Sequence, residues 1–570
     1  MNNYKDEMKR WLDCETVDAE TKAAIEAMNE DDQLSSFGGY MSFGTAGLRS
    51  KMSPGIGRMN TYTIAHATNA LAKTIYEYGE EAVARGVAIA YDSRNNSIEF
   101  ARRSAEVLSA YKIKSYLYDS LRPTPVLSFA LRYLNCIAGI NVTASHNPAE
   151  YNGYKVYWED GAQIGPEQAD AIANIMKNTD VLSDVPTEVN EEYIIPMPAE
   201  VDEKYMECVL AEIVNAEEIK KAADDLAIVY TPLHGAGIKM VPEVLRRAGI
   251  KNVSIVEEQS VPNGDFPTVH FPNPEFPEAF TLGLEIAKKV GSSLVVATDP
   301  DADRVGVMAK NSEGEFKCIT GNQMGALLLD YIITAYNESG TMPSEPYAIK
   351  SVVSSALAAE ICKVNNVKMY DVLTGFKYIG EVIKNHEAMG RGTFLLGFEE
   401  SYGYLKGTYA RDKDAVVASL LICEMAAYYF NRGMTLIDAL EGLFKKYGCF
   451  YERTCSVYID RPDGQEIMER LMSDLRVNPP EEIVGKKIVE ARDYKNEVIL
   501  NKVDGTTSPT GLPKANMLYY ITADGDVIII RPSGTEPKIK AYILLKAATM
   551  EAAIEYADKI DNWFKESFKG

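Results

Sequence analysis

The sequence lacks the features of membrane, secreted and zinc-binding proteins. No run of eighteen apolar residues occurs in the 570 residues, and the N-terminal stretch Met-Asn-Asn-Tyr-Lys-Asp-Glu-Met-Lys lacks the apolar segment of a secretory signal. The eight cysteines are scattered singly, without a Cys-x-x-Cys pair, which argues against a disulfide framework and against a zinc site. These absences predict a soluble cytoplasmic protein that is not bound to a membrane.

The sequence also lacks an excess of positive charge. It has 59 lysines and arginines against 82 aspartates and glutamates, a formal net charge of −23. Such an acidic chain argues against nucleic acid or an anionic membrane as the main partner, and leaves room only for a local basic pocket that binds a small phosphate ester. No Gly-x-x-x-x-Gly-Lys-Ser/Thr motif occurs, which disfavours a nucleotide-driven kinase or ATPase of the P-loop class.

The chain alternates helical periodicity with short β-branched runs, which is typical of α/β units with parallel sheets. An example is the helical pattern over 65–78 followed by a strand over 86–91. The last part differs, because strands over 527–530 and 540–545 precede a helix over 550–564, an α+β pattern. Length alone predicts about three to five domains. The pattern predicts four: 1–200, 201–320, 321–448 and 449–570.

The most informative segment is Leu294-Val-Val-Ala-Thr-Asp-Pro-Asp-Ala-Asp-Arg304, an apolar strand that ends in three alternating aspartates. Asp299, Asp301 and Asp303 can converge on one ion, and oxygen ligands favour Mg²⁺, Ca²⁺ or Mn²⁺ over zinc. An EF-hand loop fails, because it requires glycine at the sixth position and glutamate at the twelfth. Arg304 beside the ion suggests an anionic ligand such as phosphate. A solvated acidic turn is the alternative.

A second segment, Thr143-Ala-Ser-His-Asn-Pro148, follows the apolar run 137–142. A serine on a sharp loop at the end of a strand can present an exposed hydroxyl, and it differs from the Gly-x-Ser-x-Gly elbow of hydrolases. The alternative is a Ser/Asn turn that caps the next element.

Three further loops carry groups suited to sugars and phosphates. Gly397-Phe-Glu-Glu-Ser-Tyr-Gly403 offers two carboxylates and a hydroxyl, which suit a polyol. Arg531-Pro-Ser-Gly-Thr-Glu-Pro-Lys538 combines an arginine, two hydroxyls and a glycine, which together form an oxyanion nest. Phe43-Gly-Thr-Ala-Gly-Leu-Arg49 is a weaker Gly-rich loop. Each of the first two is also compatible with an ordinary turn.

Taken in order, the serine, metal, sugar and phosphate loops resemble those of the α-D-phosphohexomutase family, and the resemblance spans essentially the whole chain. It implies three related α/β domains with mixed or parallel sheets and a smaller C-terminal α+β domain around a central active-site cleft. It also implies an enzyme that moves phosphate between O1 and O6 of a hexose through a phosphorylated serine, with one Mg²⁺ per subunit and a hexose 1,6-bisphosphate as activator.

The resemblance further implies a role for each site residue. Ser145 carries the phosphoryl group, and the metal is held by Ser145, Asp299, Asp301 and Asp303. The phosphate on Ser145 is neutralised by Arg49, His146, Lys155 and Arg304, with Lys155 expected to transfer the proton. Glu399 and Ser401 bind O3 and O4 of the sugar, assisted by Thr374 and Lys413. The phosphate that does not react is held by Arg531, Ser533, Gly534 and Thr535.

The sugar loop is more similar to the phosphoglucomutase version, Gly-Glu-Glu-Ser-Phe-Gly, than to the Gly-Glu-x-Ser-Gly-His form of phosphomannomutases. The resemblance therefore favours interconversion of glucose 1-phosphate and glucose 6-phosphate. The run Thr231-Pro-Leu-His-Gly-Ala-Gly237 resembles a long-chain branch that includes phosphopentomutases and glucose-1,6-bisphosphate synthases, so mannose or pentose phosphates and bisphosphate synthesis stay as alternatives. A silent sugar-phosphate sensor would not need Ser145 with three aspartates. The expected partners are small sugar phosphates, and the expected state is a monomer or homodimer.

Overall fold

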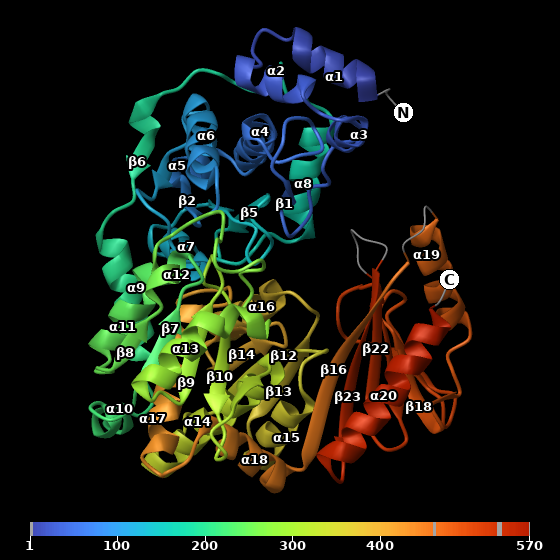
Figure 1. The fold of residues 1–570 in the computed structure, drawn as a ribbon. Helices are drawn as coiled ribbons and strands as arrows, with labels where there is room; N and C mark the ends of the chain where they lie inside the picture. The colour runs from blue at the N-terminus through green and yellow to red at the C-terminus, as the bar shows by residue number, and fades with distance from the viewer. Residues whose placement is uncertain (1–3, 460–462, 533–537, 569–570) are drawn as a thin grey trace.

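The computed structural model describes residues 4–459, 463–532 and 538–568, which form four sheets, each with its own helices (Figure 1). The N-terminal α/β part lies at the top of the view, and the C-terminal part lies beside the third sheet at lower right. The predicted fold class, three α/β domains followed by an α+β domain, is confirmed. No helix in the described part of the chain is long and apolar enough to cross a membrane.

The first sheet has six strands in the order β1-β5-β4-β2-β3-β6. The pairs β4–β2, β2–β3 and β3–β6 are parallel, whereas β5 runs antiparallel to both β4 and β1. The strands are β1 (Leu48–Lys51), β5 (Tyr151–Trp158), β4 (Ala138–Val142), β2 (Val87–Tyr91), β3 (Ser115–Leu117) and β6 (Ile194–Pro196). The helices around them are α4 (Thr61–Glu77), α5 (Glu80–Arg85), α6 (Ser97–Ala110), α7 (Thr124–Tyr133) and α8 (Pro166–Lys177).

Helix α4 begins four residues before the predicted start. The reason is a capping box, in which the Asn60 side chain accepts from the backbone of Thr63 while the Thr63 hydroxyl accepts from the backbone N–H of Asn60. Three short helices precede this domain, α1 (Tyr4–Asp13), α2 (Ala19–Glu26) and α3 (Glu30–Phe37). They attach through a small apolar cluster around Trp11, Phe37 and Val181.

The second sheet has the order β11-β10-β9-β7-β8, in which β7 is parallel to β8 and β9, and β10 is antiparallel to its neighbours. Its strands are β7 (Ile228–Thr231), β8 (Val253–Ile255), β9 (Leu294–Thr298), β10 (Val305–Lys310) and β11 (Phe316–Ile319). Its helical elements are α9 (Glu200–Ala211), α10 (Ala216–Ala222), η2 (Ala236–Lys239), α11 (Val241–Arg247), α12 (Glu257–Ser260), η3 (Pro277–Phe280) and α13 (Thr281–Val290).

The third sheet has the order β13-β12-β14-β15, with β12 parallel to both β13 and β14. Its strands are β12 (Pro346–Ser351), β13 (Lys368–Val372), β14 (Thr393–Glu399) and β15 (Gly403–Leu405). Its helices are α14 (Gly321–Ser339), α15 (Ala356–Val364), α16 (Phe376–Met389), α17 (Ala415–Phe430) and α18 (Leu436–Tyr447). Helix α17 is buried on nearly all sides, because one apolar core is continuous through the first three domains.

The C-terminal sheet is antiparallel and has a separate apolar core. Its strands are β16 (Cys449–Tyr458), β17 (Glu482–Ile483), β18 (Lys486–Asp493), β19 (Val498–Asn501), β20 (Thr507–Pro509), β21 (Leu518–Thr522), β22 (Val527–Pro532) and β23 (Lys538–Ala547). Its helices are α19 (Gly464–Val477) and α20 (Met550–Ser567). The chain enters this domain through Gly448, whose φ of +109° favours glycine.

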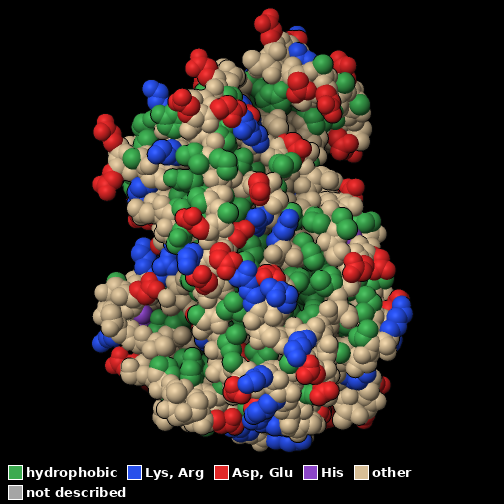
Figure 2. Space-filling model, turned by 90° about the vertical axis from the view of Figure 1, so that its left-hand side faces the viewer, with side chains coloured by type: hydrophobic (Ala, Val, Ile, Leu, Met, Phe, Trp, Pro, Cys, Tyr) green, Lys and Arg blue, Asp and Glu red, His purple; other side chains and the backbone are tan. Residues whose placement is uncertain are grey.

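The surface agrees with the acidic composition. Figure 2 shows one face on which basic side chains occur in small groups among acidic ones, without covering the face. All eight cysteines are free thiols.

Candidate active site

Ser145 lies just beyond the end of β4 in a strained backbone conformation. Its φ is +52°, in the left-handed region that residues other than glycine rarely adopt. The backbone N–H of Ser145 donates to Thr143 Oγ1 at 2.8 Å, and Arg94 Nη2 donates to the Ser145 carbonyl at 2.6 Å. Thr143 in turn donates to buried Asp92 at 2.6 Å. These contacts hold a buried serine hydroxyl in one position at the end of the strand.

The metal loop meets the serine loop directly. Ser145 Oγ donates to Asp299 Oδ2 at 2.8 Å, although the two residues belong to different domains. One ligand oxygen from each of Asp299, Asp301 and Asp303 lies within 4.8 Å of the others, and all three side chains are buried. The three aspartates of the sequence pattern therefore do converge, next to the predicted phosphoserine.

The carboxyl groups of this cluster shift one another's pKa values. Burial raises the pKa of Asp299 well above its usual range, and the carboxylates of Asp301 and Asp303 raise it further. Burial would also raise the pKa of Asp301, but the ammonium group of Lys155, together with the hydrogen bonds of Asp299 and Thr124, outweighs burial and lowers that pKa. Three buried carboxyl groups at this spacing are unfavourable unless a cation shares them.

The cluster has the ligand atoms that a hard divalent cation requires. Among the described residues, Asp301 Oδ1 and Asp303 Oδ1 are buried and have no hydrogen-bond partner, so oxygens are free to ligate. The nearest cations are two lysines: Lys155 Nζ lies 2.8 Å from Asp301 Oδ2, and Lys413 Nζ lies 3.2 Å from Asp303 Oδ2. The oxygen-only donor set fits Mg²⁺.

Lys155 differs from the expectation in its surroundings. It was expected among cations, yet it lies on β5 against Asp301 and also 3.7 Å from Asp303 Oδ2. Lys413 has the same kind of partners. Burial alone would lower the pKa of Lys413, but Asp303 and Asp412 outweigh burial and raise that pKa.

The run 231–237 packs beneath the metal loop. The Ala236 N–H donates to the Pro300 carbonyl at 2.7 Å. A Cβ at Gly235 would lie 2.4 Å from Pro300 Cα, and one at Gly237 would lie 2.4 Å from Thr298 Oγ1. His234 is a buried structural residue, with its ring nitrogens 3.0 Å from the Val261 carbonyl and 2.8 Å from Thr268 Oγ1.

Three predicted cations stand near the serine loop. Arg49 donates to Asn147 Oδ1 at 3.1 Å, and His146 Nδ1 is 3.2 Å from Ser145 Oγ. Burial lowers the pKa of His146 well below its usual value, and the nearby charges of Arg304 and Arg49 lower it further, so the imidazole is neutral here. Arg304 Nη1 donates to Glu275 Oε1 at 2.9 Å, a carboxylate that the sequence analysis did not identify.

The sugar loop follows β14. Glu399 is buried, and its Oε1 accepts from the backbone N–H of Gly375 at 2.6 Å. Burial raises the pKa of Glu399 to about 7, and the neighbouring Glu400 also raises it. Glu400 Oε2 itself accepts from Ser351 and Ser354 at 3.1 and 3.3 Å. Of the two glutamates, Glu399 is therefore the less engaged by side-chain donors.

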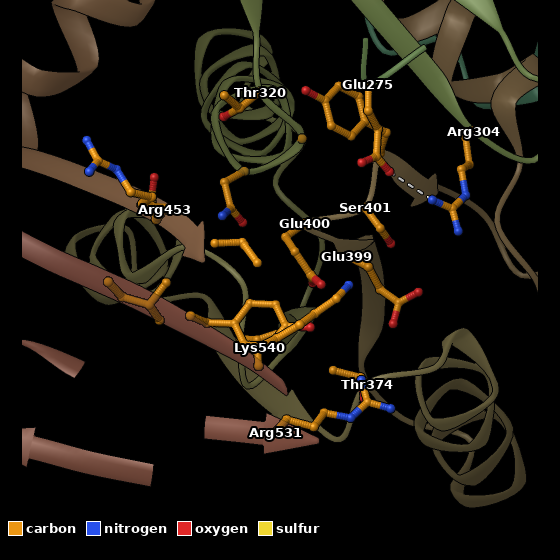
Figure 3. Close-up of a pocket in the computed structure, with 18 of the residues that line it drawn as sticks. Glu275, Arg304, Thr320, Thr374, Glu399, Glu400, Ser401, Arg453, Arg531 and Lys540 are labelled. Atoms are coloured by element: carbon orange, nitrogen blue, oxygen red, sulfur yellow. Dashed lines mark hydrogen bonds and ion pairs between the residues drawn. The ribbon is translucent and has the colours of Figure 1, made fainter. Parts of the chain in front are cut away.

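His146, Arg304 and Glu399 line one cleft of about 580 Å³, to which all four domains contribute. Figure 3 shows Thr374, Glu399 and Ser401 facing Arg304 and Glu275 on one side and Arg531 and Lys540 on the other. The lining residues from the first three domains include His146, Glu275, Arg304, Thr320, Asn322, Thr374, Glu399, Glu400, Ser401 and Tyr402. Those from the C-terminal domain are Glu452, Arg453, Thr454, Arg531, Lys540, Tyr542 and Leu544.

The C-terminal domain places two cations side by side in the cleft. Arg531 on β22 pairs in register with Lys540 on β23. Like charges directly opposite one another destabilise a strand pair unless an anion lies between them. Ser533, Gly534 and Thr535, the other predicted phosphate-binding residues, lie outside the described residues. Lys540 was missed because it lies two residues beyond the loop motif, although its alternation along a strand next to Arg531 was a usable signal.

Comparison with known proteins agrees with this architecture. Residues 40–182, 203–314 and 320–447 match family models described as phosphoglucomutase/phosphomannomutase alpha/beta/alpha domains I, II and III. Fold and site thus define a sugar-phosphate mutase. The chain belongs to the phosphoglucomutase/phosphomannomutase family, within the α-D-phosphohexomutases that the sequence motifs predicted, and it is an enzyme of the isomerase class.

Several similar curated proteins are named phosphoglucomutase. One from Staphylococcus aureus is 37% identical over 550 residues, which cover 95% of this chain and 96% of that protein. One from Staphylococcus haemolyticus is 36% identical over 512 residues, which cover 90% and 91%. These relatives confirm the predicted family and enzyme class, and they carry the phosphoglucomutase name that the sugar loop favoured.

Solved structures share the fold at lower identity. The open form of the Paramecium phosphoprotein pp63/parafusin, titled as a phosphoglucomutase, has a TM-score of 0.67 at 18% identity and covers 92% of this chain and 95% of its own. A phosphoglucomutase/phosphomannomutase family protein from Burkholderia thailandensis has a TM-score of 0.65 at 18% identity and covers 93% and 98%.

Proposed function

We propose that the enzyme interconverts glucose 1-phosphate and glucose 6-phosphate through a phosphorylated Ser145 and a bound glucose 1,6-bisphosphate. The observation that carries the proposal is the direct contact between Ser145 Oγ and Asp299 Oδ2 at 2.8 Å, next to His146, which lines a cleft with sugar-type and phosphate-type groups. The relatives named phosphoglucomutase support the choice of glucose.

In the proposed reaction the bond between Ser145 Oγ and phosphorus breaks, and a bond forms between phosphorus and the free hydroxyl oxygen of the bound sugar phosphate. We assign the transfer of the hydroxyl proton to Lys155. The bisphosphate then turns over in the cleft and returns its other phosphoryl group to Ser145. Positioning and charge stabilisation supply most of the catalysis in such transfers.

The residues act in two groups. Asp299, Asp301 and Asp303 would hold Mg²⁺ together with an oxygen on phosphorylated Ser145, and the ion would supply charge stabilisation for the moving phosphoryl group. The phosphoryl group on Ser145 would also be neutralised by Arg49, Lys155 and Arg304, and the neutral ring of His146 would hydrogen-bond to it.

The second group recognises the substrate in either orientation. Glu399 and Ser401 would bind O3 and O4 of the sugar, with Thr374 and Lys413 beside them. Arg531, Ser533, Gly534, Thr535 and the newly found Lys540 would hold the phosphate that is not reacting. A hexose 1,6-bisphosphate would prime the enzyme by phosphorylating Ser145. We further infer a cytoplasmic location, which the eight free thiols support.

The test is a coupled assay of glucose 1-phosphate, mannose 1-phosphate and ribose 1-phosphate side by side, with Mg²⁺ and a trace of glucose 1,6-bisphosphate. We expect the highest kcat/KM with glucose 1-phosphate. The Ser145→Ala variant should lose more than about a hundredfold in kcat, equivalent to about 2.7 kcal/mol, and intact mass should show no added phosphate. A preference for mannose or ribose phosphate would contradict the proposed substrate, and an active Ser145→Ala enzyme would contradict the phosphoserine.

A further inference from the structure

Glu275 places a carboxylate in a cleft that receives anionic phosphates. Its Oε1 accepts from Arg304 Nη1 at 2.9 Å, and the two side chains are 30% and 19% exposed. Both residues line the cleft. A carboxylate here repels an incoming phosphate, so a favourable effect of Glu275 must offset this repulsion.

The backbone holds Glu275 in place from the same strand that holds Arg304. The Glu275 N–H donates to Asn273 Oδ1 at 3.0 Å, in a short turn that lies over β10. A Cβ at Gly306 on β10 would lie 2.2 Å from the Pro274 carbonyl oxygen, so the turn packs directly on that strand. Arg304 immediately precedes β10, and the pair is therefore a rigid unit of the second domain.

The other anions near Arg304 belong to the reaction. Arg304 Nε lies 3.8 Å from Asp303 Oδ1, and it has no hydrogen-bond partner among the described residues. Glu399 lies across the cleft and interacts electrostatically with Arg304. Figure 3 shows Arg304 joined to Glu275, with Ser401 and Glu399 beside the pair. An arginine released from Glu275 would turn to Asp303 or Glu399, a proposed metal ligand and a proposed sugar ligand.

We propose that Glu275 is a positioning residue for the mutase reaction: it holds the Arg304 guanidinium at the cleft wall, toward the substrate phosphate and away from Glu399 and Asp303. The inference rests on the proposed function and extends it: besides the phosphoryl group on Ser145, Arg304 in the cleft wall also contacts the phosphate of the bound sugar. Glu275 acts through Arg304 and does not touch the reacting atoms.

The experiment compares Glu275→Gln with the matched control Glu278→Gln, an exposed glutamate on η3 of the same segment. Glu275→Gln should raise KM about tenfold for both glucose phosphates, while kcat changes less than about threefold. Glu278→Gln should match the wild type. In an Arg304→Ala background, Glu275→Gln should have no further effect, because the group that it positions is gone. Equal losses in both backgrounds, or an unchanged KM, would overturn the proposal.

A binding measurement separates this inference from the proposed function. Glucose 6-phosphate and inorganic phosphate are each titrated calorimetrically into Ser145→Ala enzyme, with and without Glu275→Gln. We expect weaker binding of both ligands in the Glu275→Gln enzyme, at an unchanged thermal unfolding midpoint. Failure of the wild type to convert glucose phosphates would contradict the proposed function alone, since weakened phosphate binding would still support the role of Glu275. Unweakened phosphate binding would contradict that role.

Discussion

At the scale of single residues, the clearest sign of a ligand is the pairing of two like charges. Arg531 and Lys540 face each other across β22 and β23, and both line the cleft. Burial lowers the pKa of Lys540, and the nearby Lys538 lowers it further. A phosphate between the two cations would offset their electrostatic repulsion, since its charge-assisted hydrogen bonds contribute roughly 1.5–3 kcal/mol.

We therefore expect Arg531→Ala and Lys540→Ala each to raise KM for glucose 1-phosphate and glucose 6-phosphate by similar factors, of about tenfold or more. Phosphorylation of Ser145 by added bisphosphate should still occur, because the metal loop is unchanged, but it should be slower. Forward and reverse kinetics provide the measurement. A defect confined to one isomer would show that this site serves a single orientation, and the shared-site mechanism would have to be dropped.

Glu399 gives a prediction about pH. Its pKa is raised to about 7, first by burial and then by Glu400, so the folded protein keeps a proton on it that the unfolded chain releases near its ordinary value. Stability therefore falls as pH rises from about 4.5 to 7, and this cost is fully present above pH 7. Glu399→Gln removes the cost and still accepts from Gly375. Relative to the wild type, the variant should gain roughly 3 kcal/mol at pH 8 and much less at pH 5.

Thermal unfolding at the two pH values tests this, with the wild type as reference. A Glu399→Gln variant whose gain is the same at pH 5 and pH 8 would show that the carboxyl group is not protonated in the folded enzyme. Because glutamine has the shape of glutamate but no charge, sugar recognition should weaken at pH 8 while the phosphate contact stays intact.

Some residues of the site were predictable and others were not, for a physical reason. Asp299 and Ser145 could be predicted from local residue spacing, since a loop with carboxylates at alternate positions has few functions other than metal binding. Glu275 lies in a Pro-rich turn with no motif, and only packing against Gly306 brings it to Arg304. The partners of Lys155 could not be predicted from the sequence either, because they come from another domain.

At the scale of elements, the run 231–237 acts as a support for the metal loop. The sequence linked this run only to a branch of the family. In the fold, Gly235 and Gly237 allow the turn after β7 to pack against Pro300 and Thr298, on either side of Asp299. Residues that support metal ligands in this way typically change metal affinity 10–100-fold when altered.

Gly235→Ala should therefore weaken Mg²⁺ binding by about tenfold or more, although no ligand is changed. The matched control is Gly442→Ala on α18, where an added Cβ meets no atom within 4 Å. That control should gain up to about 1 kcal/mol from helix propensity and bind the metal normally. Calorimetric titration measures the Mg²⁺ affinity of both variants. Equal affinities for the two variants would mean that the metal loop does not depend on this support.

At the scale of the whole molecule, the cleft exists only because four domains meet. Alternating helices and strands predicted the four units, since local periodicity reports local structure. The arrangement of the domains was not readable in the same way. It depends on contacts between distant residues, such as the continuous core of the first three domains and the cluster of Val353, Leu373 and Ile529 that joins the third to the fourth.

Among the described residues, a polar contact between Ser355 and Glu452 joins the phosphate-binding domain to the third domain. Ser355 Oγ, at the N-terminus of α15, donates to a carboxylate oxygen of Glu452 on β16. Burial raises the pKa of Glu452 to about 7, while Ser355 and the nearby Lys350 act in the opposite direction. The bond therefore stabilises the charged form of Glu452, which is present mainly above pH 7. Ser355 also accepts from the Leu357 N–H as the cap of α15.

Ser355→Ala should lower stability at all pH values by about 1 kcal/mol through the lost cap. At pH 8 it should cost a further 1–3 kcal/mol or so, because a buried carboxylate then lacks its donor. At pH 6 Glu452 is neutral, and the extra cost should largely vanish. The double variant Ser355→Ala with Glu452→Gln should show the cap effect alone. Thermal midpoints at pH 6 and 8 measure the difference, and KM at pH 8 shows whether a loosened C-terminal domain binds the distal phosphate less well. A pH-independent loss would mean that the Ser355 to Glu452 contact does not help hold that domain against the cleft.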